Sequence, residues 1–269
     1  MGIEILDQDI NAFGLRPIQI WGKVPLVFTG SGAQGFTNVN LHFVNHDNTY
    51  LIRMPQNLKR RERTIQDTRK EMEFTGFETH GGVWKMRTQK EQVDFSQNAF
   101  WSGLRVVPLS TMEGHRGLIM PYIKDASTLR ESLLHGSLDS SLRVLTHLRH
   151  AHKLDIIFGD RWTNNTLLTP DGGFYEVDYD IALGGKHARE FELAQFLFHV
   201  VHFSAERGDI LRKLKDYSCK HPLREDYEID VVELFVKNYT HHYGNIGTYE
   251  ELSVIGQDEI TPLLSALRE

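Results

Sequence analysis

Three side chains with oxygen donors, Asp160, Asn165 and Asp178, stand at the ends of short apolar segments between residues 156 and 185. A Pro-Asp-Gly-Gly sequence at residues 170–173 separates two of these segments, which predicts a tight β-hairpin. A rigid hairpin can bring all three side chains into one small volume. A hard cation takes oxygen from Asn165 and Asp178, and Asp160 can orient a hydroxyl and accept its proton, as Mg²⁺-assisted phosphoryl transfer requires.

A simpler interpretation treats the same residues as turn formers. Asp and Asn are common in turns because their side chains bond nearby backbone amides. Asp178 and Asp180 can also cap the segment that follows the strand. Each residue taken alone favours this interpretation, whereas the spacing of all three together favours the chemical one.

The sequence Gly-Asp-Arg-Trp-Thr-Asn-Asn at residues 159–165, followed by Val-Asp-Tyr-Asp at 177–180, resembles the catalytic loop and metal-binding strand of the protein-kinase-like fold. The resemblance is closest to its small-molecule branch, which includes aminoglycoside phosphotransferases and choline kinases. It implies that Asp160 is the catalytic base, that Asn165 and Asp178 hold the metal, and that the cofactors are ATP and Mg²⁺.

The same resemblance implies an α+β fold of two lobes. We expect an antiparallel β-sheet N-lobe at residues 1–123 and a mainly helical C-lobe at 124–269, which contains the catalytic loop and the metal-binding strand. Protein kinases usually have a longer segment after the metal-binding strand than the eleven positions from Asp178 to Arg189. A small-molecule acceptor is therefore favoured over a protein.

A glycine-rich sequence at residues 30–35 follows a predicted strand at 18–28. A dinucleotide-binding turn would require a helix directly after the glycines, but the next residues alternate with period two, as a strand does. A glycine-rich hairpin whose amides approach phosphate oxygens is favoured over a flexible hairpin without a ligand. The predicted nucleotide-binding residues here are Gly30, Ser31, Gly32 and Gly35.

A cation that binds the nucleotide phosphates is expected by resemblance on the third strand, at residues 50–54. Arg53 is the first candidate and Lys85 its competitor. The acidic partner of this cation is Glu71 or Glu91, and the sequence leaves that choice open. The alternative is that Arg53 is a surface residue on an edge strand.

Two further strands are predicted at residues 104–109 and 117–122. By resemblance, the segment after them is the hinge whose backbone contacts the adenine, with Met120, Tyr122 and Ile123 as the contacting residues. Helices are predicted at residues 57–77, 88–103, 129–134, 142–151 and 190–203, and about three more beyond residue 209.

Composition excludes several other classes. Hydrophobic content of 40% and charged content of 25% are ordinary for a soluble globular protein, and a net charge of −6 gives no sign of nucleic-acid or membrane binding. A single cysteine, Cys219, excludes an internal disulfide and suits a reducing compartment. We find no apolar stretch of about 18 residues and no secretory signal, so a cytoplasmic protein is expected.

The favoured hypothesis is a phosphotransferase whose partners are ATP and a small-molecule acceptor. A catalytically inactive relative that binds nucleotide or a partner protein is the alternative, because Phe158, Trp162 and Arg53 depart from the usual residues of the family. A protein kinase is the third hypothesis. The identity of the acceptor cannot be derived from the sequence.

Overall fold

The computed structural model describes residues 28–31, 38–45, 48–55, 58–111, 117–246, 255 and 257–268. Its N-terminal part contains a five-stranded antiparallel sheet in the order β1-β2-β3-β6-β5. The strands are β1 (Phe28–Ser31), β2 (Asn38–Asn45), β3 (Asn48–Pro55), β5 (Ser110–Thr111) and β6 (Leu118–Pro121). Strand β3 pairs with β6, so that Arg53 lies opposite Leu118 and Tyr50 opposite Pro121.

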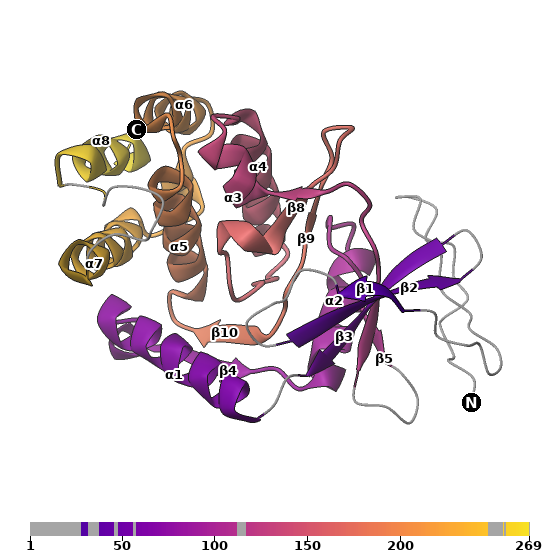
Figure 1. Cartoon of the computed structure of the whole chain (residues 1–269). Helices are drawn as coiled ribbons and strands as arrows, with labels where there is room; N and C mark the ends of the chain where they lie inside the picture. Colours follow the sequence, from indigo (N-terminus) through magenta and orange to yellow (C-terminus); the bar gives the residue numbers. More distant parts are fainter. Residues whose placement is uncertain are drawn as a thin grey trace.

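The C-terminal part is mainly helical (Figure 1). Its helices are α3 (Leu129–Leu134), α4 (Asp139–Lys153), α5 (Ala188–His202), α6 (Arg207–Lys220), α7 (Ile229–Ile246) and α8 (Gln257–Arg268). A small sheet joins β7 (Ser127–Thr128), β8 (Thr166–Leu168) and β9 (Phe174–Glu176). The predicted α+β class is confirmed, with an antiparallel sheet in the N-terminal part and a mainly helical C-terminal part.

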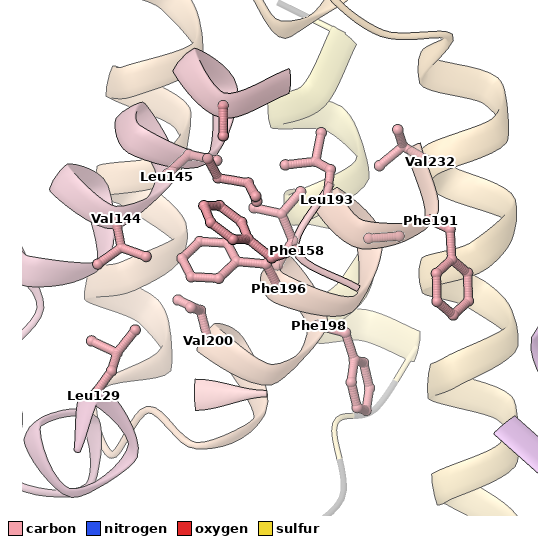
Figure 2. Packing of buried hydrophobic residues seen from close by; sticks show 14 of the residues in the cluster. Leu129, Val144, Leu145, Phe158, Phe191, Leu193, Phe196, Phe198, Val200 and Val232 are labelled. Carbon is pink, nitrogen blue, oxygen red and sulfur yellow. The ribbon is translucent and has the colours of Figure 1, made fainter. Parts of the chain in front are cut away.

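Helix α5 is the centre of the helical part. Thirteen consecutive residues from Glu190 to His202 are buried, because the helix is surrounded on all sides by other elements. Phe158, which lies two positions before Asp160, is fully buried and packs between side chains of α4 and α5 (Figure 2). The loop that carries Asp160 is therefore attached to the largest apolar cluster of the protein.

Two elements from the first half of the chain join the helical part instead of the large sheet. Strand β4 (Gly82–Met86) pairs with β10 (Ile181–Gly185), and helix α1 (Leu58–Thr75) packs against α7 (Figure 1). Asn238 Nδ2 on α7 donates a hydrogen bond of 2.7 Å to the Thr75 carbonyl at the end of α1. The lobe division between residues 123 and 124 stays a prediction. Strand β4 and helix α1 lie before it in sequence but pack with elements that come after it.

The helix predicted at residues 88–103 forms as α2 (Gln89–Trp101). Its first turn is stabilised by a capping box, in which Thr88 Oγ1 accepts from the Glu91 amide and the Glu91 carboxylate accepts from the Thr88 amide. Helix α3 begins with the same arrangement of Thr128 and Glu131.

The strand predicted at residues 104–109 is wrong. Only Ser110–Thr111 form β5, and Val106 makes an isolated bridge to Glu176. Leu104, Val106 and Val107 are all fully buried, and a short apolar run of this kind is not distinguished from a strand by its pattern.

Other predictions are missing from, or only partly covered by, the described structure. Strand β4 was not predicted, and the strand predicted at 18–28 lies outside the described residues except for Phe28 in β1. Among the described residues, we find no helix with the length and apolar character needed to cross a membrane.

Candidate functional site

The predicted hairpin forms from β8 and β9, with Thr166 paired with Glu176 and Leu168 with Phe174. The pairing continues one step further, because the Val177 amide donates to the Asn165 carbonyl at 2.9 Å. Asn165 and the residue before Asp178 are therefore adjacent across the hairpin. This is how a separation of thirteen positions in sequence becomes a short distance in space.

Asp160 lies in the segment that leads into the β8–β9 hairpin and is half-buried. Its Oδ1 atom is buried and receives no hydrogen bond from any described residue. Asn165 Nδ2 donates to the Asp160 carbonyl at 3.2 Å, which fixes the loop between them. Burial raises the pKa of Asp160 well above its usual value, and the negative charges of Glu71 and Asp178 raise it further. Asp160 is therefore a carboxyl group with unusual proton affinity and an unused acceptor atom.

Asp178 and Asp180 both contact Arg53, while Tyr179 between them is buried in the core. Arg53 Nη2 donates to Asp178 Oδ1 at 2.8 Å and to Asp180 Oδ2 at 2.9 Å. Asp178 also has a positive φ of 65°, a conformation that costs free energy in a non-glycine residue and is common at functional sites. The structure thus places Arg53 directly beside the predicted metal-binding residue, and Arg53 is 8% exposed instead of lying on the surface.

The other three candidates for this ion pair lie elsewhere. Glu71 Oε1 accepts from Gln195 Nε2 at 2.8 Å and from the Tyr239 hydroxyl at 2.6 Å. Lys85 is exposed and pairs with Glu91 at 2.5 Å. Arg53 therefore takes its carboxylate partners from the segment after the hairpin and from neither predicted glutamate.

A buried arginine that the sequence analysis did not consider joins the two halves of the site. Arg87 Nη1 donates to the carbonyls of Phe158, Tyr179 and Ile181 at 2.9, 3.1 and 2.5 Å, and Nη2 donates to the Ile157 carbonyl at 3.2 Å. Burial lowers the pKa of Arg87 to about 10, so the guanidinium remains charged at neutral pH. No local pattern could have revealed it, because its partners lie about 70 to 94 positions away.

Gly159 and Glu192 fix the backbone just before Asp160. Gly159 has φ of 107°, and a Cβ atom there would lie 1.9 Å from the Ile181 carbonyl oxygen. Glu192 Oε1 accepts from the Gly159 amide at 2.6 Å, and Oε2 accepts from the Phe158 amide at 3.2 Å. Glu192 thereby attaches the loop that carries Asp160 to α5.

Two residues that depart from the family pattern both have packing roles. Phe158 is fully buried, and the Arg161 guanidinium lies over its ring at 4.7 Å. The half-buried ring of Trp162 lies against that of His199, with centroids 4.1 Å apart. Both side chains therefore pack against neighbouring groups, Phe158 against Arg161 and Trp162 against His199 of α5.

The predicted nucleotide-binding residues are only partly covered. Gly30 and Ser31 lie in β1, whereas Gly32 and Gly35 lie outside the described residues. Met120 lies in β6, where it pairs with Leu51 of β3. Tyr122 and Ile123 follow directly after β6. The predicted hinge therefore lies one strand away from Arg53.

The donors fit a hard divalent ion that also binds phosphate oxygens. In the described part of the chain, no group of three or more His, Cys, Asp and Glu side chains could hold a metal ion by itself. Asp178 and Asn165 offer a carboxylate and an amide oxygen, and Mg²⁺ is commonly held by one or two protein oxygens together with substrate phosphates and water.

No protein-family model and no curated protein sequence matches this chain. Among solved structures, it is similar to WaaP in complex with acyl carrier protein, at 14% identity and a TM-score of 0.47, over 80% of this chain and 90% of that one. It is also similar to the choline kinase LicA from Streptococcus pneumoniae, at 13% identity and a TM-score of 0.36, over 88% of this chain and 90% of that one. Since such likeness concerns the fold, we take the function from the side chains of the site.

Proposed function

We propose that the protein is an ATP-dependent phosphotransferase that moves the γ-phosphoryl group of Mg-ATP to a hydroxyl of a small molecule. One observation carries the proposal: Asp160 has a buried carboxylate oxygen without a hydrogen-bond donor among the described residues, close to Asn165 and Asp178. An acceptor hydroxyl supplies the donor that this oxygen lacks. The raised pKa of Asp160 suits a group that takes up a proton.

Each residue then has a defined task. Asp160 orients the acceptor hydroxyl and accepts its proton as the new oxygen–phosphorus bond forms and the bond to the diphosphate leaving group breaks. Asn165 and Asp178 hold the divalent ion, which neutralises charge on the phosphate oxygens when it is bound. Arg53 and the glycine-rich segment at residues 30–35 bind the phosphates, and Met120, Tyr122 and Ile123 contact the adenine.

The segment after Asp180 supports a small acceptor. Residues 181–185 pair along their whole length with β4, and α5 begins at Ala188. This leaves no long segment between metal-binding strand and helix that could form a platform for a protein substrate. The protein-kinase hypothesis is therefore disfavoured.

Binding and turnover test the proposal separately. We expect calorimetric titration to show ATP binding that Mg²⁺ strengthens, and we expect slow release of phosphate from ATP to water. Asp160→Asn should retain ATP binding and lose turnover by about 100-fold or more, because proton transfer contributes factors of this size. Asp178→Ala should lose both the Mg²⁺ effect and turnover.

Asp171→Asn is the matched control, because Asp171 is an exposed carboxylate in the turn of the same hairpin. Undiminished turnover in Asp160→Asn contradicts the assignment of the base. ATP binding without phosphate transfer to water or to any of a panel of small alcohols, sugars and amino alcohols favours the catalytically inactive alternative.

A further inference from the structure

Arg53 is held by two carboxylates, and one nitrogen atom makes both contacts. Nη2 donates to Asp178 Oδ1 at 2.8 Å and to Asp180 Oδ2 at 2.9 Å. The three side chains differ in exposure: 9% for Arg53, 16% for Asp180 and 34% for Asp178. Asp178 is thus the carboxylate that faces solvent, and Asp180 is the one enclosed with the guanidinium.

The two carboxylates have different fates under the proposed function. Asp178 is the residue assigned to the divalent ion, whose positive charge repels the guanidinium beside it. A buried arginine that loses its carboxylate partner is strongly destabilised, because its charge is then neither solvated nor paired. A second carboxylate that stays in place when the ion arrives keeps the Arg53 guanidinium paired with an anion.

Asp180 meets this requirement because its backbone is fixed from two sides. Its carbonyl accepts from the Arg87 amide at 2.7 Å, and the preceding Tyr179 hydroxyl accepts from the Val107 amide at 3.0 Å. The following residue, Ile181, starts the β10–β4 pairing opposite Met86. The Asp180 side chain thus projects towards Arg53 from a segment with little freedom to move.

We infer that Asp180 is a positioning residue that holds Arg53 against the nucleotide phosphates while Asp178 is engaged by the divalent ion. The inference rests on the proposed function. It gives Arg53 a carboxylate partner within the metal-binding segment itself, in place of Glu71 or Glu91 on the helices. One short sequence, Asp-Tyr-Asp, then serves the metal and the phosphate-binding cation together.

A double-mutant cycle tests the inference through binding, without measuring turnover. ATP is titrated into wild type, Asp180→Asn, Arg53→Gln and the double variant, each with and without Mg²⁺. We expect Asp180→Asn to weaken Mg-ATP binding about tenfold, and the double variant to bind no more weakly than Arg53→Gln alone, because Asp180 acts through Arg53. Without Mg²⁺, Asp178 still holds Arg53, so Asp180→Asn should change ATP affinity less than about threefold.

Two further variants test whether weaker Mg-ATP binding by Asp180→Asn comes from loss of folding instead of loss of the carboxylate. Asp180→Glu keeps the carboxylate and should recover part of the Mg-ATP affinity. Asp171→Asn should bind like wild type. The double variant removes both charges and so leaves no buried ion without a partner, which keeps the cycle readable even if Asp180→Asn is less stable.

The outcomes separate this inference from the proposed function. Wild-type protein without affinity for ATP overturns both. Wild-type affinity that depends on Mg²⁺, combined with unchanged binding by Asp180→Asn, overturns only the inference. Effects of Asp180→Asn and Arg53→Gln that add in the double variant also overturn it, because they show that Asp180 acts independently of Arg53, for example as a metal ligand.

Discussion

Replacing Arg87 by methionine should loosen the connection between the two halves of the site. The guanidinium donates to four carbonyls, those of Ile157, Phe158, Tyr179 and Ile181, and it is 8% exposed. Methionine has similar length and donates no hydrogen bond, so these buried acceptors lose a charged donor.

The size of the effect follows from the contacts. A hydrogen bond to a charged group contributes about 1.5 to 3 kcal/mol, which gives an upper sum of about 6 to 12 kcal/mol for four. Three of the four share Nη1, and water can enter to satisfy some of the carbonyls, so we expect a loss of about 3 to 5 kcal/mol in the free energy of unfolding. Arg87→Lys keeps one charged donor and should lose about half as much.

Urea unfolding followed by tryptophan fluorescence measures this loss. At a slope of about 3 kcal/mol per molar urea, the midpoint of Arg87→Met should fall by about 1 to 1.7 M. Arg143→Met is the matched control, because Arg143 is exposed and donates to the Gly172 carbonyl in a surface turn. An Arg87→Met protein that unfolds within about 0.3 M of wild type, with unchanged ATP turnover, would refute the role assigned to Arg87.

Two further predictions concern the backbone near Asp160 and the response to acid. Gly159→Ala should lose about 2 to 6 kcal/mol of stability and most ATP turnover, because a side chain at this φ is strained and its Cβ overlaps the Ile181 carbonyl. Gly208→Ala is the control and should be tolerated, because a Cβ at Gly208 has no atom within 4 Å. Burial lowers the pKa of His202 to about 4, so between about pH 6.5 and 4 the unfolded chain binds more protons and stability falls as the pH falls. After allowance for solvent screening, His202 should contribute about 1 to 2 kcal/mol to this fall in stability. Urea unfolding at pH 7.5 and at pH 5 should show that the free energy of unfolding depends less on pH in His202→Gln than in wild type, whereas His135→Gln should behave like wild type. An equal dependence on pH in both variants contradicts the role assigned to His202.

The parts of the site that could be predicted from the sequence are those with local signals. A Pro-Asp-Gly-Gly turn between two apolar segments specified the β8–β9 hairpin, and the pairing of that hairpin brought Asn165 next to the residue before Asp178. Helix α2 could be predicted from its periodicity, and Thr88 and Glu91 stabilise its first turn.

Contacts over long sequence distances could not be predicted in this way. Arg87 binds carbonyls up to 94 positions away, and nothing in the residues around it indicates those partners. Glu71 was a candidate partner of Arg53 because of its place on a predicted helix, but that helix packs on α7, where Tyr239 binds the carboxylate instead. Local patterns specify helices and strands, whereas the elements against which a helix such as α1 packs depend on the whole fold.

The pairing of β4 with β10 limits how the large sheet and the helical part can move relative to each other. The chain passes from the large sheet to the helical part after β3, returns through α2 before β5, and passes back again after β6. Two bodies joined by one segment of chain can reorient in many directions, whereas three separate connections restrict their relative movement. We therefore expect the large sheet and the helical part to keep nearly the same relative orientation, so that a ligand at the proposed site would enter and leave through movement of side chains more than through separation of these two parts.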